Sequence, residues 1–276
     1  MIKETHIENL PLSAPVFESF YTGRAKDGKY TYLMPQIIAK GLTPLGMAGV
    51  MTQRVVAPES VRDNWLNNYF FTVDGNPCHP DGRFKFVPDC SLLRAITSET
   101  VLVNGSIPLN DGVYESLQGT EFSATDRKFT GKNLTETEAK KDPFWHAFSR
   151  GNQELQDAYV EKIFKVLRDV YKTDTGMPVF PGSIPKTPSL RAWLVDRVVD
   201  CDGSAAYGNG DLDYDYSRLV AVVGAGGAVK ELPRSGTHEN LESVLGTTLQ
   251  QSLDTGKPFE YQGKVYFSVD KSDIPV

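Results

Sequence analysis

The sequence contains few cysteines: Cys78, Cys90 and Cys201 are the only three, and they form no Cys-x-x-Cys pair. An odd number of widely spaced cysteines does not provide a disulfide framework and favours a reducing compartment. The first residues also lack the apolar run that is typical of a secretory signal. We therefore expect a cytoplasmic protein without structural disulfides.

Long apolar stretches and basic runs are missing as well. The apolar stretches fall far short of the ~20 residues that a membrane-spanning helix needs. The formal net charge is −6, whereas non-specific nucleic-acid binding requires Lys and Arg side chains that displace phosphate counterions. This acidic balance argues against nucleic acid and against a membrane surface, and it is compatible with a protein partner.

No complete catalytic motif is present. The sequence contains no Gly-x-Ser-x-Gly, His-Glu-x-x-His, Gly-x-Gly-x-x-Gly or Walker pattern. The adjacent residues Cys78 and His79 are poor candidates for a zinc pair or a catalytic dyad, because such groups come from more widely spaced positions. We interpret their stretch as a hairpin loop, and the catalytic residues remain unknown at this point.

The composition is otherwise that of a globular protein, with 40% hydrophobic and 23% charged residues. The 24 glycines and 17 prolines favour many short elements joined by turns. A single domain over residues 1–276 is the first expectation. A subdivision is conceivable near 131–142, which is polar, or near 173–189, where four prolines predict a domain connection or a segment that wraps over the surface.

The first half of the chain predicts mostly antiparallel hairpins. Asp27-Gly28 predicts a hairpin between strands at 17–23 and 29–34, and Asn104-Gly105 predicts a type I′ turn between two strands. The apolar runs at 68–73 and 83–87 are expected to pair. Two helices are expected here, at 43–56 with Thr43 as the N-cap and at 57–70.

The second half predicts helices packed on a sheet, so that the whole chain reads as an α+β fold. Apolar residues recur at helical spacing over 152–172, 188–199 and 237–256, although the end of the second segment also suits a strand. The segment 213–223 predicts a strand that enters the core. A hairpin is expected about Gln262-Gly263.

The acidic stretch 200–215 is the best candidate for chemistry. It is not an EF-hand, because Ala205 stands where the calcium loop needs glycine. The order Gly203-Ser204 followed by Asp211-x-Asp213 resembles the nucleotidyltransferase signature, although the gap is shorter than is usual in that family.

The resemblance implies a glycine turn at Gly203 and Ser204 that binds phosphates, and carboxylates that hold divalent cations for in-line transfer. The implied metal ligands are Asp211, Asp213, Asp215 and Glu260.

Two hypotheses therefore stand, and whether the protein is an enzyme stays open. The first is a binding or assembly protein, for which the acidic stretch is an ordinary turn rich in Asp and Gly. The alternative is a metal-dependent nucleotidyl or phosphoryl transferase that uses the acidic stretch. The substrate, the ligand and the oligomeric state do not follow from the sequence.

Overall fold

The computed structural model describes residues 29–198, 203–215 and 217–221 with their side chains. It describes the backbone alone at Val222, in β1 (Phe17–Phe20), in β13 (Phe259–Tyr261) and in β14 (Lys264–Tyr266). The chain divides into two compact units, residues 1–232 and 233–276. In the second unit β13 and β14 pair antiparallel, which confirms the hairpin predicted there. The single domain and its two alternative boundaries stay predictions.

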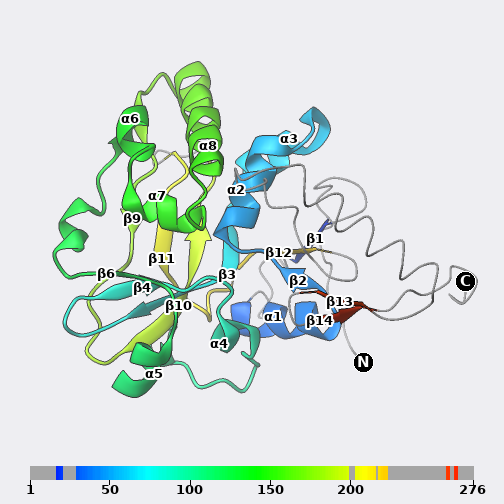
Figure 1. Cartoon of the computed structure of the whole chain (residues 1–276), viewed down its shortest axis with the longest axis vertical. Coiled ribbons are helices and arrows are strands. Elements are labelled where there is room, and N and C mark those ends of the chain that lie inside the picture. The colour runs from blue at the N-terminus through cyan, green and yellow to red at the C-terminus, as the bar shows by residue number, and fades with distance from the viewer. Residues whose placement is uncertain are drawn as a thin grey trace, which may run out of the picture. The chain divides into compact units, whose positions relative to one another are not determined.

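The first unit is built on a mixed sheet in which ten strands are described (Figure 1). Its main strand order is β1, β12 (Leu219–Val222), β3 (Phe70–Cys78), β10 (Ser189–Val195), β11 (Ala206–Gly210) and β9 (Val179–Phe180). Shorter strands extend it: β2 (Thr43–Pro44) on β12, β4 (Phe84–Phe86) on β3, β6 (Thr120–Phe122) on β4, and β5 (Ile107–Pro108) on β10. The pairs β12–β3 and β11–β9 are parallel, and a separate pair joins β7 (Leu134–Thr135) to β8 (Thr175–Gly176).

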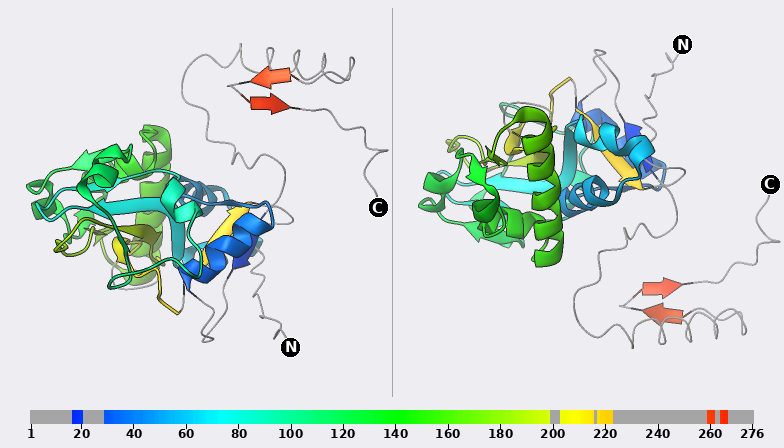
Figure 2. Two further views of the ribbon diagram at one scale, coloured as in Figure 1. Left: turned by 90° about the horizontal axis from the view of Figure 1, so that it is seen from below. Right: turned by 90° about the horizontal axis from the view of Figure 1, so that it is seen from above.

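Short helices connect these strands. They are α1 (Tyr30–Ala39), α2 (Met47–Val56), α3 (Glu59–Leu66), α4 (Ser91–Arg94), α5 (Asp111–Ser116), α6 (Glu136–Ala139), α7 (Pro143–Phe148) and α8 (Gln153–Val166), together with a 3₁₀ turn η1 (Asp126–Phe129) and a π turn η2 (Leu167–Tyr171). The long helix α8 lies beside α2 (Figures 1 and 2). The sequence-based prediction of α8 is confirmed. No helix among the described residues is long and apolar enough to span a bilayer.

Two hydrophobic cores lie against the sheet, and β10 contributes to both. Leu190 and Ala192 pack into the core under α1 and α4. Trp193 and Val195 pack into the larger core under α2, α7 and α8. The register shifts between Ala192 and Leu194, and this bulge lies between the two pairs.

The helix expected at 188–199 is therefore wrong. Because both faces of β10 are buried, its apolar residues do not alternate with polar ones along the whole strand. The resulting run imitates a helical stripe. The observed strand occupies 189–195, whereas the sequence allowed a strand only at the β-branched end of this segment.

The strand expected at 29–34 is also wrong, because α1 begins at Tyr30. Tyr30, Met34 and Ile37 all face the second core, at the three- and four-residue spacing of a buried helix face. That spacing is visible in the sequence. In the sequence it competes with the hairpin signal of the Asp-Gly pair that precedes it.

The helix expected from Thr43 begins only at Met47, because Thr43 and Pro44 form β2. The cap comes from a distant strand: the backbone N–H of Met47 donates to the carboxylate of buried Asp74 at 2.6 Å. A Cβ at Gly46 would lie 2.7 Å from both oxygens of this carboxylate. A local reading of the sequence cannot find a cap supplied by β3.

The α+β class is confirmed, since helices pack on a mixed sheet. The finer division into a hairpin-rich first half and a second half with helices on a sheet is not confirmed, because strands of both halves alternate across one sheet. The β3–β4 hairpin and the Val103–Ser106 hairpin are confirmed. The helix predicted at 237–256 lies outside the described residues.

Candidate ligand-binding groove

An open groove of about 970 Å³ lies on the sheet of the first unit. Its floor comes from β3, β10 and β11. The segment 181–187 forms one wall, and residues 103–108 together with 211–213 form the other. The lining residues are Asn76, Cys78, Val103, Asn104, Gly105, Ser106, Pro108, Pro181, Gly182, Ser183, Ile184, Pro185, Lys186, Thr187, Ser189, Arg191, Asn209, Asp211 and Asp213.

Asn76 is a buried polar group in the floor, with 1% of its surface exposed. Its Nδ2 donates to the carbonyl oxygens of Pro181 at 2.9 Å and Gly208 at 2.6 Å. Because both partners can only accept, the orientation of the amide is fixed. Its Oδ1 is buried and finds no partner among the described residues.

Arg191 lies opposite Asn76 in the β10–β3 pairing and ties the second wall together. Its Nη1 donates to the Asn209 carbonyl at 2.9 Å and to the Asp211 carboxylate, and its Nη2 donates to the Asn104 carbonyl. The hairpin carrying Asn104 is thereby fastened to the end of β11.

The same hairpin needs glycine at position 105. Gly105 has a φ of 71°, and a Cβ there would lie 2.6 Å from the Asp211 carboxylate. Its carbonyl accepts from the Leu212 N–H at 2.8 Å. Asn104 has a φ of 50°, and two successive positive φ values are those of the predicted type I′ turn.

Arg127 holds one end of the first wall through hydrogen bonds. Its Nε and Nη1 donate to the carbonyls of Gly82 and Gly182, each at 2.6 Å, and its guanidinium lies 5.0 Å from the centre of the Phe84 ring. At the other end, the Pro188 carbonyl accepts from Leu109 N–H at 2.8 Å. Between these anchors, no hydrogen bond joins the main chain of residues 183–187 to any described residue.

Seven polar side chains of the groove are uncommitted. They make no hydrogen bond or ion pair within the described part of the chain. Two of them carry opposite charges, Lys186 on the first wall and Asp213 on the second. The seven are Asn104, Ser183, Lys186, Thr187, Ser189, Asn209 and Asp213.

The predicted phosphate-binding residues lie elsewhere, in the interior. Ser204 is fully buried, and its hydroxyl lies 2.8 Å from Arg54 Nη1 and 2.6 Å from the Tyr159 hydroxyl. Gly203, which has a φ of 47°, is buried next to Leu167.

Arg54 accounts for the position of Ser204. It is fully buried, and each of its five N–H groups has an acceptor. None of these acceptors is a carboxylate. They are Trp65 O, Asn68 O, Asp196 O, Tyr159 Oη and Ser204 Oγ.

The predicted metal ligands lie in different surroundings. Asp211 and Asp213 both line the groove, where Asp211 pairs with Arg191. Asp215 is exposed, 4.0 Å from Lys29, and Glu260 belongs to β13 in the second unit. Among the described residues, no group of three or more His, Cys, Asp or Glu side chains could hold a metal ion. The metal and phosphate roles stay predictions.

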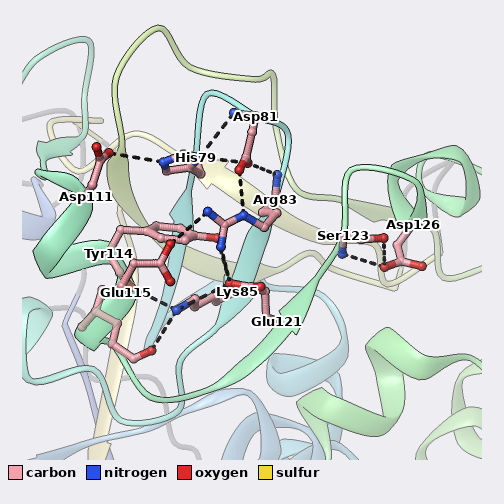
Figure 3. A network of polar contacts seen from close by, with 11 residues as sticks. His79, Asp81, Arg83, Lys85, Asp111, Tyr114, Glu115, Glu121, Ser123 and Asp126 are labelled. Atoms are coloured by element: carbon pink, nitrogen blue, oxygen red, sulfur yellow. Dashed lines mark hydrogen bonds and ion pairs between the residues drawn. The ribbon is translucent and has the colours of Figure 1, made fainter.

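A second polar region lies at the β3–β4 hairpin, and we call it the hairpin network (Figure 3). At its centre Arg83 makes ion pairs with Asp81 at 2.7 Å, Glu115 at 2.9 Å and Glu121 at 3.3 Å. Lys85 donates to the carbonyls of Tyr114, in the last turn of α5, and of Leu117, which follows the helix. The hairpin network consists of His79, Asp81, Arg83, Lys85, Asp111, Tyr114, Glu115 and Glu121.

The neighbours Cys78 and His79 belong to different regions. Cys78 lines the groove, and burial raises the pKa of its thiol. The ring of His79 lies between the carboxylates of Asp81 at 2.9 Å and Asp111 at 3.3 Å. The hairpin is confirmed, but its loop is shorter than predicted, because Cys78 and the first Asp-Gly pair lie within β3.

The sequence gave no motif for Asn76 or Arg191. The one signal available was the alternation of Ser189 and Arg191 with apolar neighbours, which is that of a strand with one polar face. The proline-rich segment was expected to be either a domain connection or a surface wrap. Residues 181–187 form a wall of the groove.

Comparison with known proteins relates this fold to a known one. No family model matches the chain, and no curated protein is significantly similar to it. The chain is similar to a solved structure whose description reads "Accommodation of massive sequence variation in Nanoarchaeota by the C-type lectin fold". The TM-score is 0.56 at 16% identity, over 77% of this chain and 100% of the other. The fold of this chain resembles the C-type lectin fold.

Proposed function

We propose that the protein is a binding protein whose ligand occupies the groove. The observation that carries this proposal is the group of seven uncommitted polar side chains, together with the unpartnered Oδ1 of Asn76. Polar groups that serve only the fold usually find partners inside it. A concave surface with several convergent free polar groups is the usual form of a ligand site, and its volume lies at the upper end of the range for such sites, roughly 300–1,000 Å³.

The fold supports the same proposal. The solved structure to which this chain is similar is described as accommodating massive sequence variation. A framework that tolerates changed side chains suits binding proteins, because recognition then depends on surface residues and the cores stay constant. In this chain the cores are formed by residues other than the seven uncommitted side chains of the groove.

A blocking substitution tests the proposal. The full-length chain is screened against three ligand classes: random peptides displayed on phage, an array of glycans, and a set of small metabolites. Ser183→Trp fills the groove from its exposed wall, and Ser98→Trp places the same side chain at an exposed position outside the lining. We expect a ligand that binds the parent and Ser98→Trp but not Ser183→Trp. The absence of any ligand, or equal binding by all three proteins, contradicts the proposal.

The divalent-metal binding expected from the sequence is a separate proposal. Asp211 and Asp213 face one groove, and Asp213 is free of any described partner. A cation bound to the folded state raises the melting temperature. We expect such a rise with Ca²⁺, Mg²⁺ or Mn²⁺ and its loss in Asp213→Asn; no rise with any of the three contradicts it. The transferase alternative and the cytoplasmic location stay predictions that no observation on the groove favours.

A further inference from the structure

We propose that the ligand of the groove is a polypeptide segment in an extended conformation. This inference rests on the proposed function of the groove and names the chemical class of its ligand. Four properties of the lining support it: a free main chain in one wall, opposite free charges on the two walls, apolar side chains at the rim, and a buried acceptor in the floor.

The main chain of residues 183–187 is the first property. The carbonyls just before it are taken by Asn76 and Arg127, and the carbonyl just after it is taken by Leu109. The segment is thus held at both ends, while its own N–H and C=O groups have no described partner. Extended peptides bind to such groups through their own main chain, and this supplies affinity that does not depend on the peptide sequence.

The two free charges are the second property. Lys186 lies on the first wall and Asp213 on the second, whereas the charge of Asp211 is already balanced by Arg191. The groove therefore presents one unpaired cation and one unpaired anion in its described lining. A ligand with both an acidic and a basic group matches them, and charges placed in this way select among partners and fix their register.

Apolar contacts are the third property. Val103 and Ile184, one on each wall, are 50% and 53% exposed. Covering them removes apolar surface from water, which is favourable by about 25 cal/mol for each Å². None of the described lining residues is aromatic. The lining therefore offers no ring against which a nucleobase or a sugar could stack.

The Oδ1 of Asn76 is the fourth property. A buried acceptor without a partner destabilises the state that contains it by about 1–3 kcal/mol. An N–H or O–H donor that reaches the floor would satisfy this oxygen. A peptide offers donors of this kind along its whole length, directly or through a water that it encloses.

The closing experiment uses charge exchange. Random peptides displayed on phage are selected on the full-length parent, synthesised, and measured by fluorescence polarisation. The groove variant combines Lys186→Glu with Asp213→Lys. The matched control combines Lys141→Glu with Asp174→Lys at exposed positions outside the lining.

We expect the selected peptides to carry both charges and to bind the groove variant about tenfold or more weakly, with no loss on the control. A peptide with its own acidic and basic residues exchanged should regain affinity for the groove variant. Peptides that bind all three proteins equally overturn the inference. If glycans or metabolites bind in a manner that Ser183→Trp abolishes while no peptide does, the peptide inference is wrong and the proposed function stands. If no ligand class depends on the groove, both are wrong.

Discussion

The groove and the hairpin network meet in the sequence at the peptide bond between Cys78 and His79, since Cys78 lines the groove and His79 belongs to the network. The two regions differ in whether their polar side chains have partners within the chain. In the network every charged side chain has a partner within the chain. In the groove, seven polar side chains and one buried oxygen have none among the described residues. Removing a committed group should therefore lower stability, whereas removing an uncommitted group should change binding alone.

The largest effect is expected at Arg54, the most fully committed side chain. Arg54→Met removes five donors from the interior. The main-chain carbonyls of Trp65, Asn68 and Asp196 lose theirs, whereas the hydroxyls of Tyr159 and Ser204 still bond to each other. We expect the free energy of unfolding to fall by about 3–5 kcal/mol, measured by urea denaturation. Lys141→Met, at an exposed position, is the control. An unchanged denaturation midpoint in Arg54→Met would refute the account of committed groups.

Two carboxylates, Asp81 and Asp142, have pKa values that are shifted in opposite directions, and this difference makes stability depend on pH. Partial burial alone would raise the pKa of Asp81, but hydrogen bonds from Arg83 and His79 outweigh it and lower the pKa to about 2. The carboxylate of Asp142 accepts only from the backbone N–H groups of Phe144 and Trp145 within the described structure, and burial raises its pKa to about 6 from 3.8.

The folded state therefore holds the proton of Asp142 more tightly than the unfolded state does. This contribution to stability is complete below the unfolded pKa and is lost as the pH rises through about 6. Asp142→Asn keeps a capping oxygen and removes the charge. Relative to the parent, we expect the variant to gain about 2–3 kcal/mol between about pH 4 and about pH 8. Urea denaturation at several pH values measures it, and a difference that is independent of pH argues against the assignment.

The next effect compares two lysines directly. Lys85 of the hairpin network is buried and donates to the carbonyls of Tyr114 at 3.0 Å and Leu117 at 3.2 Å. Lys85→Met should lower the free energy of unfolding by about 1–3 kcal/mol, because two acceptors lose a charged donor. Chemical denaturation tests this, and a loss no larger than that of the corresponding groove substitution would remove the contrast.

The smallest effect is expected for that groove substitution. Lys186 is exposed and has no described partner. Lys186→Met should therefore change the free energy of unfolding by less than about 0.5 kcal/mol. A larger loss in the same denaturation assay would show that Lys186 is committed to the fold.

The sequence predicted the elements whose signals are local. Helix α8 and the Asn104-Gly105 turn follow from spacing and turn chemistry, and the Asp-x-Asp pattern singles out Asp211 and Asp213, which both line the groove. The sequence could not predict that Ser204 would be buried, because that position depends on the hydrogen-bonding needs of Arg54, which is 150 residues away. Asn76 is inconspicuous in the sequence for the same reason, since its missing partner becomes evident only in three dimensions.

Hydrogen exchange of the main chain tests the central claim most directly. Because residues 183–187 lack main-chain partners in the described structure, their amides should exchange rapidly in the free protein. With the tightest ligand from the screen bound, we predict slowed exchange at Ser183, Ile184, Lys186 and Thr187, and unchanged exchange in the hairpin network. Protection that appears elsewhere while residues 183–187 continue to exchange rapidly would contradict the assignment of the groove as the binding site.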